Sequence, residues 1–159
     1  MGNAFQTFLR SSITVFACLI LIACSDDVGL DQHGQKVAAE RLQGQWLVIN
    51  YWAEWCAPCR TEIPELNALS SQLAKESVQV VGVNFDALRG KELGTASDAM
   101  GIKFTVLEED PAPRFKLPRA EALPVTYIVD DKGQMRERLL GEQTAAGITK
   151  RLQALRDEG

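Results

Sequence analysis

Two cysteines separated by two residues, Cys56 and Cys59, carry the chemistry that the sequence offers. The apolar run 46–49 before them is typical of a buried strand, and the residues after them have helical spacing. Both sulfurs are therefore expected at a turn between a strand and a helix, where a dithiol can open and close without unfolding the chain. A Cys-x-x-Cys motif in this setting indicates redox chemistry.

Three other uses of the cysteine pair are open: a zinc site, an inert disulfide, and a peroxidase that forms a sulfenic acid. A zinc site needs about four ligands. Residues 37–159 supply only two cysteines, and the single histidine, His33, precedes them, so no metal is expected. Nothing resembles the peroxiredoxin cysteine motif. The expected redox group is the Cys56–Cys59 disulfide itself, with no added cofactor.

Composition limits the remaining function classes. The chain has 159 residues, of which 46% are hydrophobic, which suits one globular domain with its own core. Its formal net charge is −4 and its basic residues form no block, so no nucleic-acid partner is expected. The other two cysteines, Cys18 and Cys24, lie near the N-terminus, which excludes a framework of structural disulfides. We expect a monomer.

The first 23 residues are expected to be a signal peptide. Their apolar core, residues 13–23, is eleven residues long, and at ~1.5 Å per residue it is too short to cross a ~30 Å hydrocarbon layer. The core ends in Leu-Ile-Ala-Cys-Ser, which resembles the lipobox of bacterial lipoproteins. That resemblance implies cleavage before Cys24 and lipidation of its sulfur and amino group. An uncleaved anchor and an ordinary signal peptide are the alternatives. The polar residues 24–36 are expected to form a lipidated tether that reaches at most ~40 Å.

Hydrophobic periodicity predicts an α/β domain over residues 37–159, with a mixed central sheet and helices on both faces. The helix after the cysteines is expected to kink or break at Pro64. Residues 37–42 are either a short helix or the end of the tether. The expected strands are 46–52, 78–85, 103–107, 125–129 and 134–140, and the expected helical segments are 58–76, 87–101, 114–117 and 144–155.

The run 55–60, Trp-Cys-Ala-Pro-Cys-Arg, resembles the TlpA/ResA-like branch of thioredoxin-fold, extracytoplasmic thiol-disulfide oxidoreductases. The runs 62–66 and 123–126, Glu-Ile-Pro-Glu-Leu and Leu-Pro-Val-Thr, strengthen the resemblance, which covers about residues 44–155. It implies a thioredoxin fold in which Pro124 is cis and faces the cysteines. The residues expected to line the groove for a partner chain are Trp55, Ala57, Pro58, Leu123 and Pro124.

Position assigns different tasks to the two sulfurs. Cys56 is expected at the N-cap of the helix, where free N–H groups and the helix dipole stabilise a thiolate, so it is the attacking sulfur. Cys59, one turn later, is expected to be buried and to resolve the mixed disulfide. Pro58 lacks an N–H, and no positive charge lies between the cysteines. We therefore expect the reducing end of a scale that runs from ~−270 mV for thioredoxin to ~−120 mV for the oxidant DsbA.

The resolving thiol also needs a proton acceptor. In thioredoxins an aspartate six positions before the first cysteine has this role, but here that position is Asn50, which cannot titrate. Glu62 is the candidate replacement, because it lies three residues beyond Cys59 on the same helix face and matches the active-site glutamate of the ResA-like branch. Alternatively, Glu62 only complements the helix dipole.

These features predict a membrane-tethered reductase on the periplasmic side of a bacterial membrane, with the inner membrane favoured over the outer. Its expected partners are oxidised cysteine-containing extracytoplasmic proteins and a membrane thiol donor of the DsbD or CcdA type. Family analogy adds cytochrome c maturation as a setting. Net oxidation or isomerisation, and a lipoprotein that only binds a partner, are the alternatives.

Overall fold

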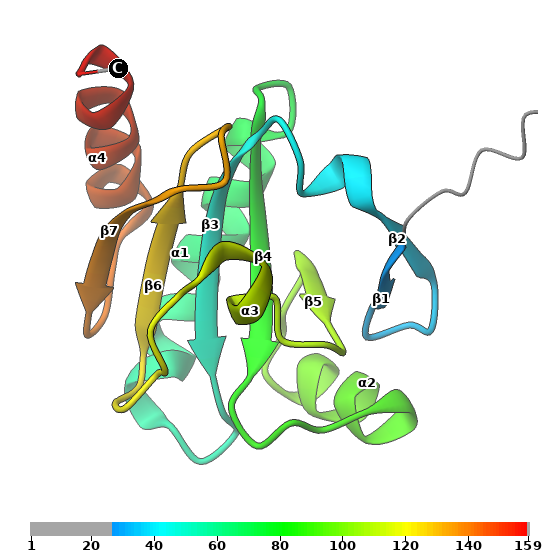
Figure 1. Ribbon diagram of the computed structural model, residues 1–159. Coiled ribbons are helices and arrows are strands. Elements are labelled where there is room, and N and C mark those ends of the chain that lie inside the picture. Colours follow the sequence, from blue (N-terminus) through cyan, green and yellow to red (C-terminus); the bar gives the residue numbers. More distant parts are fainter. Residues whose placement is uncertain (1–26, 159) are drawn as a thin grey trace, which may run out of the picture.

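A five-stranded mixed sheet forms the centre of the computed structural model, which describes residues 27–158 (Figure 1). The strand order is β5-β4-β3-β6-β7. Strands β3, β4 and β5 are parallel, whereas β6 is antiparallel to β3 and β7 is antiparallel to β6. The strands are β3 (Trp46–Trp52), β4 (Val78–Asn84), β5 (Thr105–Leu107), β6 (Val125–Val129) and β7 (Met135–Leu140).

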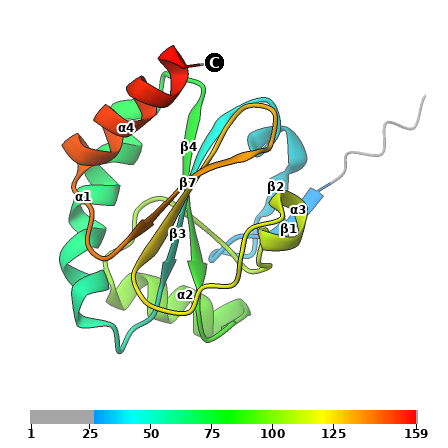
Figure 2. The ribbon, with the colours of Figure 1, turned by 60° about the vertical axis from the view of Figure 1, so that its left-hand side comes forward.

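Alternate strand residues point to opposite faces of the sheet and build two apolar clusters. The first contains Val48, Trp52 and Val80 with buried side chains of three long helices, α1 (Ala57–Leu73), α2 (Gly90–Ala99) and α4 (Ala145–Asp157). The second contains Ile49 and Tyr127 with side chains of α3 (Ala112–Phe115) and of the segment around the 3-10 helix η1 (Ala39–Arg41). Figure 2 shows α1 and α4 on one side of the sheet and α3 on the other. The predicted α/β fold with both faces covered is confirmed.

The structure differs from the expected tether over residues 24–36. From Asp27 onward the chain is folded, because β1 (Asp27–Leu30) and β2 (Lys36–Ala38) pair as an antiparallel hairpin. Gln32 lies in the turn between β1 and β2 and is buried against the outer edge of β5. Its side-chain amide donates to the carbonyl of Phe104 at 3.0 Å and accepts from the amide of Val106 at 2.8 Å. The hairpin therefore covers a sheet edge that would otherwise leave backbone groups unpaired.

Other differences are local. Helix α1 runs through Pro64 without the expected break, and α2 is shorter than residues 87–101. Residues 37–42 contain both the end of β2 and η1. The expected signal peptide and Cys24 lie outside the described residues. Within residues 27–158, no helix is long and apolar enough to span a membrane.

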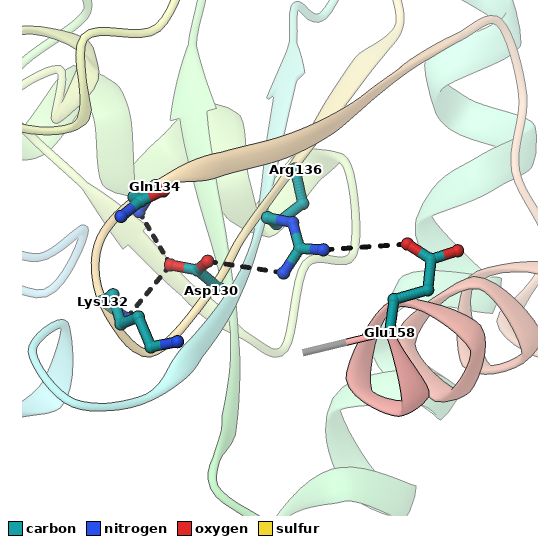
Figure 3. A network of polar contacts seen from close by, with 5 residues as sticks. All are labelled: Asp130, Lys132, Gln134, Arg136 and Glu158. Carbon is teal, nitrogen blue, oxygen red and sulfur yellow. Dashed lines mark hydrogen bonds and ion pairs between the residues drawn. The ribbon is translucent and has the colours of Figure 1, made fainter.

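The end of the sheet away from the cysteines is held by a polar network around Asp130 (Figure 3). The buried Asp130 carboxylate accepts from the backbone amides of Lys132 at 3.0 Å and Gln134 at 2.8 Å, which closes the β6–β7 turn. Arg136 lies 3.6 Å from Asp130 and 3.7 Å from Glu158, so it links the turn to the end of α4.

Candidate functional site

Cys56 and Cys59 form a disulfide at the junction of β3 and α1, with an S–S distance of 2.00 Å. Cys56 is the N-cap of α1, as the sequence predicted, and its sulfur accepts from the amide of Cys59 at 3.2 Å. Cys56 is 4% exposed and Cys59 is 0% exposed. A partner can therefore approach only Cys56, while Cys59 lies in the core cluster that packs α1 against the sheet.

An exposed aromatic rim lies beside the disulfide. Trp55 is 64% exposed, and its ring meets Phe85 edge-on with 6.1 Å between centroids. The indole N–H of Trp55 donates to the carboxylate of Asp86 at 2.9 Å, which fixes the ring. Ala57 is exposed and Pro58 is partly exposed, so both can contact a partner next to Cys56. The sequence predicted Trp55 at this surface but not its partners on the loop after β4.

The Leu123–Pro124 peptide bond is cis, as predicted from the resemblance. It directly precedes β6, whose first residue, Val125, pairs with Tyr51 near the end of β3. The loop therefore lies at the same end of the sheet as the cysteines. Pro124 is buried, Leu123 is partly exposed, and the Pro124 carbonyl accepts from the amide of Gly141 at 3.0 Å.

A cavity of about 270 Å³ adjoins the aromatic rim at Phe85. Its lining includes Tyr51, Phe85 and Arg119, so it joins the ends of β3 and β4 to the segment that leads to the cis bond. The hydroxyl of Tyr51 donates to the carboxylate of Asp110 at 2.5 Å and holds that wall in place. The described residues contain no cluster of three or more residues suited to a metal ion.

Glu62 is the central buried acid of the site and is only 1% exposed. One carboxylate oxygen, Oε2, accepts from Nδ2 of Asn50 at 3.0 Å, and Oε1 accepts from the backbone amide of Gln143 at 3.1 Å. Nδ2 of Asn50 also donates to Oγ1 of Thr126 at 3.1 Å. These hydrogen bonds lead to β3, β6 and the β7–α4 loop, so Glu62 does more than complement the dipole of its own helix.

Burial raises the pKa of Glu62 to about 7, because the carboxylate loses its hydration. The hydrogen bonds from Asn50 and Gln143 oppose this rise by favouring the charged form, whereas the nearby Glu142 adds to it. Glu62 is therefore poised to take up and release a proton near neutral pH.

The structure brings Asn50 and Glu62 into direct contact. The sequence had indicated Asn50 only as a position that lacks the usual acid. Thr126 and Gln143 were not anticipated as members of the site. Thr126 faces Asn50 in the β3–β6 register, a pairing that the sequence signals only once both strands are aligned. Gln143 lies in a loop, where no periodicity points to it.

Comparisons with known proteins agree with this geometry. The AhpC/TSA family model matches residues 23–138, and the chain belongs to that family. The thiol:disulfide interchange protein HelX of Rhodobacter capsulatus is 33% identical over 118 residues, which cover 74% of this chain and 64% of HelX. The thiol-disulfide oxidoreductase ResA of Bacillus anthracis is 26% identical over 72% of this chain and 65% of ResA. The chain thus spans just under two thirds of these relatives.

Solved structures support the fold. A thioredoxin family protein from Chlorobium tepidum superposes with a TM-score of 0.67 at 21% identity, over 82% of this chain and 92% of that one. StoA from Bacillus subtilis gives a TM-score of 0.59 at 20% identity, over 76% and 92% of the two chains. The predicted thioredoxin fold is confirmed.

Proposed function

We propose that this protein is a thiol-disulfide oxidoreductase that reduces disulfides in other extracytoplasmic proteins. The observation that carries the proposal is the Cys56–Cys59 pair at the start of α1, in which Cys56 keeps a small exposed fraction of 4% and Cys59 has none. The named relatives HelX and ResA support the same class of reaction.

In the first step, the thiolate of Cys56 attacks one sulfur of a partner disulfide. The partner S–S bond breaks, a mixed disulfide with Cys56 forms, and the other partner sulfur leaves as a thiolate. The Cys59 amide, which already points at the Cys56 sulfur, stabilises the attacking thiolate. Trp55, next to Cys56 in the chain, and the Leu123–Pro124 loop, at the same end of the sheet, are the proposed contacts for the partner chain.

In the second step, Cys59 resolves the mixed disulfide. Its thiol transfers a proton to the carboxylate of Glu62, and the resulting thiolate attacks the sulfur of Cys56. The Cys56–Cys59 disulfide forms as the bond between Cys56 and the partner sulfur breaks, and two electrons have moved to the partner. Both partner sulfurs leave as thiolates and take up protons from the solvent, and Glu62 returns its proton to the solvent. Glu62 fits the role of base because it is buried one helical turn from Cys59 and its pKa is about 7.

The surroundings of Cys56 favour electron donation. Among residues 27–158, one backbone amide, that of Cys59, donates to its sulfur. The nearest cation along the helix, Arg60, donates instead to the carbonyl of Glu54 at 2.6 Å. The thiolate is therefore not strongly stabilised, which corresponds to the thioredoxin end of the ~−270 to ~−120 mV scale.

The proposed setting is the periplasmic side of the inner membrane, where the chain acts as a monomer anchored by a lipid on Cys24. Because β1 begins at Asp27, residues 24–26 would be the whole link, and three residues reach at most about 10 Å. The domain would then work next to the bilayer and receive electrons from a membrane thiol donor of the DsbD or CcdA type. Cytochrome c maturation is the proposed pathway, by analogy with the family.

Substitution of the resolving cysteine tests the reaction. Cys59→Ser is expected to accumulate disulfide-linked partners, because the mixed disulfide on Cys56 can no longer be released. Non-reducing gels of cell extracts would show these species, and Cys56→Ser, which lacks the attacking sulfur, would show none. The absence of any adduct of Cys59→Ser would contradict the exchange mechanism and favour a protein that only binds its partners.

A further inference from the structure

The side-chain amide of Asn50 is satisfied on one side only. Its nitrogen donates to both Glu62 and Thr126, at 3.0 and 3.1 Å. Its oxygen, Oδ1, is buried and has no hydrogen-bond partner among the described residues. A buried acceptor without a partner is costly, so this arrangement requires an explanation.

The two protonation states of Glu62 need opposite partners. The carboxylate only accepts hydrogen bonds, and the nitrogen of Asn50 serves it. The protonated carboxyl group must donate one, and the same nitrogen would then face a donor with a donor. Oε1 already accepts from the amide of Gln143, which cannot accept in return, so the proton belongs on Oε2, beside Asn50.

We propose that Asn50 is a positioning residue for Glu62, whose side-chain amide turns over when the acid gains or loses its proton. With Glu62 ionised, the Asn50 nitrogen donates to it. With Glu62 protonated, the Asn50 oxygen accepts from it. The use of this exchange in catalysis rests on the proposed function, in which Glu62 takes the proton of Cys59.

Thr126 makes the turnover possible. A hydroxyl is both a donor and an acceptor and can rotate. Its oxygen accepts from the Asn50 nitrogen in the first state, and its O–H can donate to the Asn50 oxygen in the second. The unpartnered oxygen of the present structure would then have two donors. An ionised aspartate at position 50 could not donate to the carboxylate, and an apolar residue could serve neither state.

Few other charged groups act on this network. Glu142 approaches from the β7–α4 loop and raises the pKa of Glu62. On α1 itself, Arg60 and Glu65 are exposed, and Glu65 is engaged with the amide of Ala145 at 2.9 Å. From β3 and β6 the contacts are Asn50 and Thr126, which are uncharged. After reduction, the thiol of Cys59 is the remaining titratable neighbour on α1.

Nuclear magnetic resonance of the disulfide form can test the proposal directly. The pKa of Glu62 is read from its carboxyl carbon, and the orientation of Asn50 from contacts of its amide protons with the Thr126 side chain. These contacts are expected above the Glu62 pKa and should disappear below it. Contacts that are the same above and below the Glu62 pKa would contradict the proposed rotation of the Asn50 amide.

Two variants show whether Asn50 controls the acid. Asn50→Leu should raise the pKa of Glu62 by about one unit, because the carboxylate loses a charge-assisted bond that is about twice as strong as the neutral bond lost by the acid. Thr126→Val should raise the pKa of Glu62 less, and Thr126→Ser, which keeps the hydroxyl, should leave that pKa unchanged. An unchanged pKa in Asn50→Leu and Thr126→Val would contradict the positioning role. The titration is done on the resting disulfide, so its result does not depend on whether exchange activity is found.

Discussion

Burial, more than any single neighbour, sets the pKa of Glu62. Glu62 occupies a place where a carboxylate loses hydration but keeps two hydrogen bonds, from Asn50 and Gln143. The outcome is an acid that titrates near pH 7 instead of near 4.5. In the proposed mechanism, an asparagine in β3 and a glutamate in α1 thus take the place of the single aspartate of thioredoxins.

Glu62→Gln is expected to change the pH dependence of thiol exchange. The wild-type protein should gain activity as pH rises through about 7, because the carboxylate form accepts the proton of Cys59. The variant should lack this step and resolve mixed disulfides about 10²-fold more slowly above pH 7. Stopped-flow exchange with a disulfide peptide measures both effects, and an unchanged profile would remove Glu62 from the mechanism.

The same substitution should alter the pH dependence of stability. The pKa of Glu62 is raised in the folded state, so the folded protein holds the proton more tightly than the unfolded chain. The stability that this gives is fully present below pH 4.5 and is lost as pH rises through about 7. A rise from 4.5 to about 7 corresponds to about 3 kcal/mol. Between pH 5 and pH 8, the free energy of unfolding measured in urea should therefore fall more in the wild type than in Glu62→Gln.

At the scale of elements, apolar periodicity predicted the long strands well, whereas polar elements escaped it. The predicted strand 78–85 ends one residue earlier in the structure, and 46–52 and 125–129 are unchanged. The β1–β2 hairpin was expected to be a tether because residues 25–36 are almost all polar. Its attachment uses backbone hydrogen bonds and the side-chain amide of Gln32, which a pattern of hydrophobic residues cannot reveal. The Asn50–Glu62–Thr126 contacts likewise join residues up to 76 positions apart.

Gln32→Ala tests whether this hairpin is part of the fold. The substitution leaves the carbonyl of Phe104 and the amide of Val106 without their partners, so a loss of about 2 kcal/mol in the free energy of unfolding is expected. Amide hydrogen exchange should also become faster at Val106. Gln35→Ala, at an exposed position of the same hairpin, is the control and should change neither quantity. Equal effects of the two substitutions would show that the Gln32 side chain does not anchor the hairpin.

At the scale of the whole molecule, the two ends of the sheet have separate tasks. The carboxyl end of β3 leads to the cysteines, and its amino end packs near the Asp130 network. Trp46, the first residue of β3, lies between Arg136 and Arg156, at 5.9 and 5.8 Å from its ring centroid. Seven strand residues, or about 20 Å, separate this end from the site.

Asp130→Ala should therefore destabilise the molecule without changing its chemistry. The β6–β7 turn loses the acceptor for two backbone amides and the partner of Arg136, which is expected to cost about 2 kcal/mol. Urea unfolding measures this loss, and the exposed neighbour Asp131→Ala should be close to neutral. The reduction potential of the folded variant should stay at the wild-type value. A shifted potential would mean that the two ends are coupled.

The reduction potential of the Cys56–Cys59 pair is the most direct test of the proposed reductase. Equilibration of the purified domain with glutathione or dithiothreitol buffers, followed by thiol alkylation, gives the value. A potential near the thioredoxin value of about −270 mV is expected, since the Cys59 amide donates to the Cys56 sulfur while Arg60 is engaged with the carbonyl of Glu54. A value well above about −200 mV, in the range of isomerases and oxidants, would contradict it.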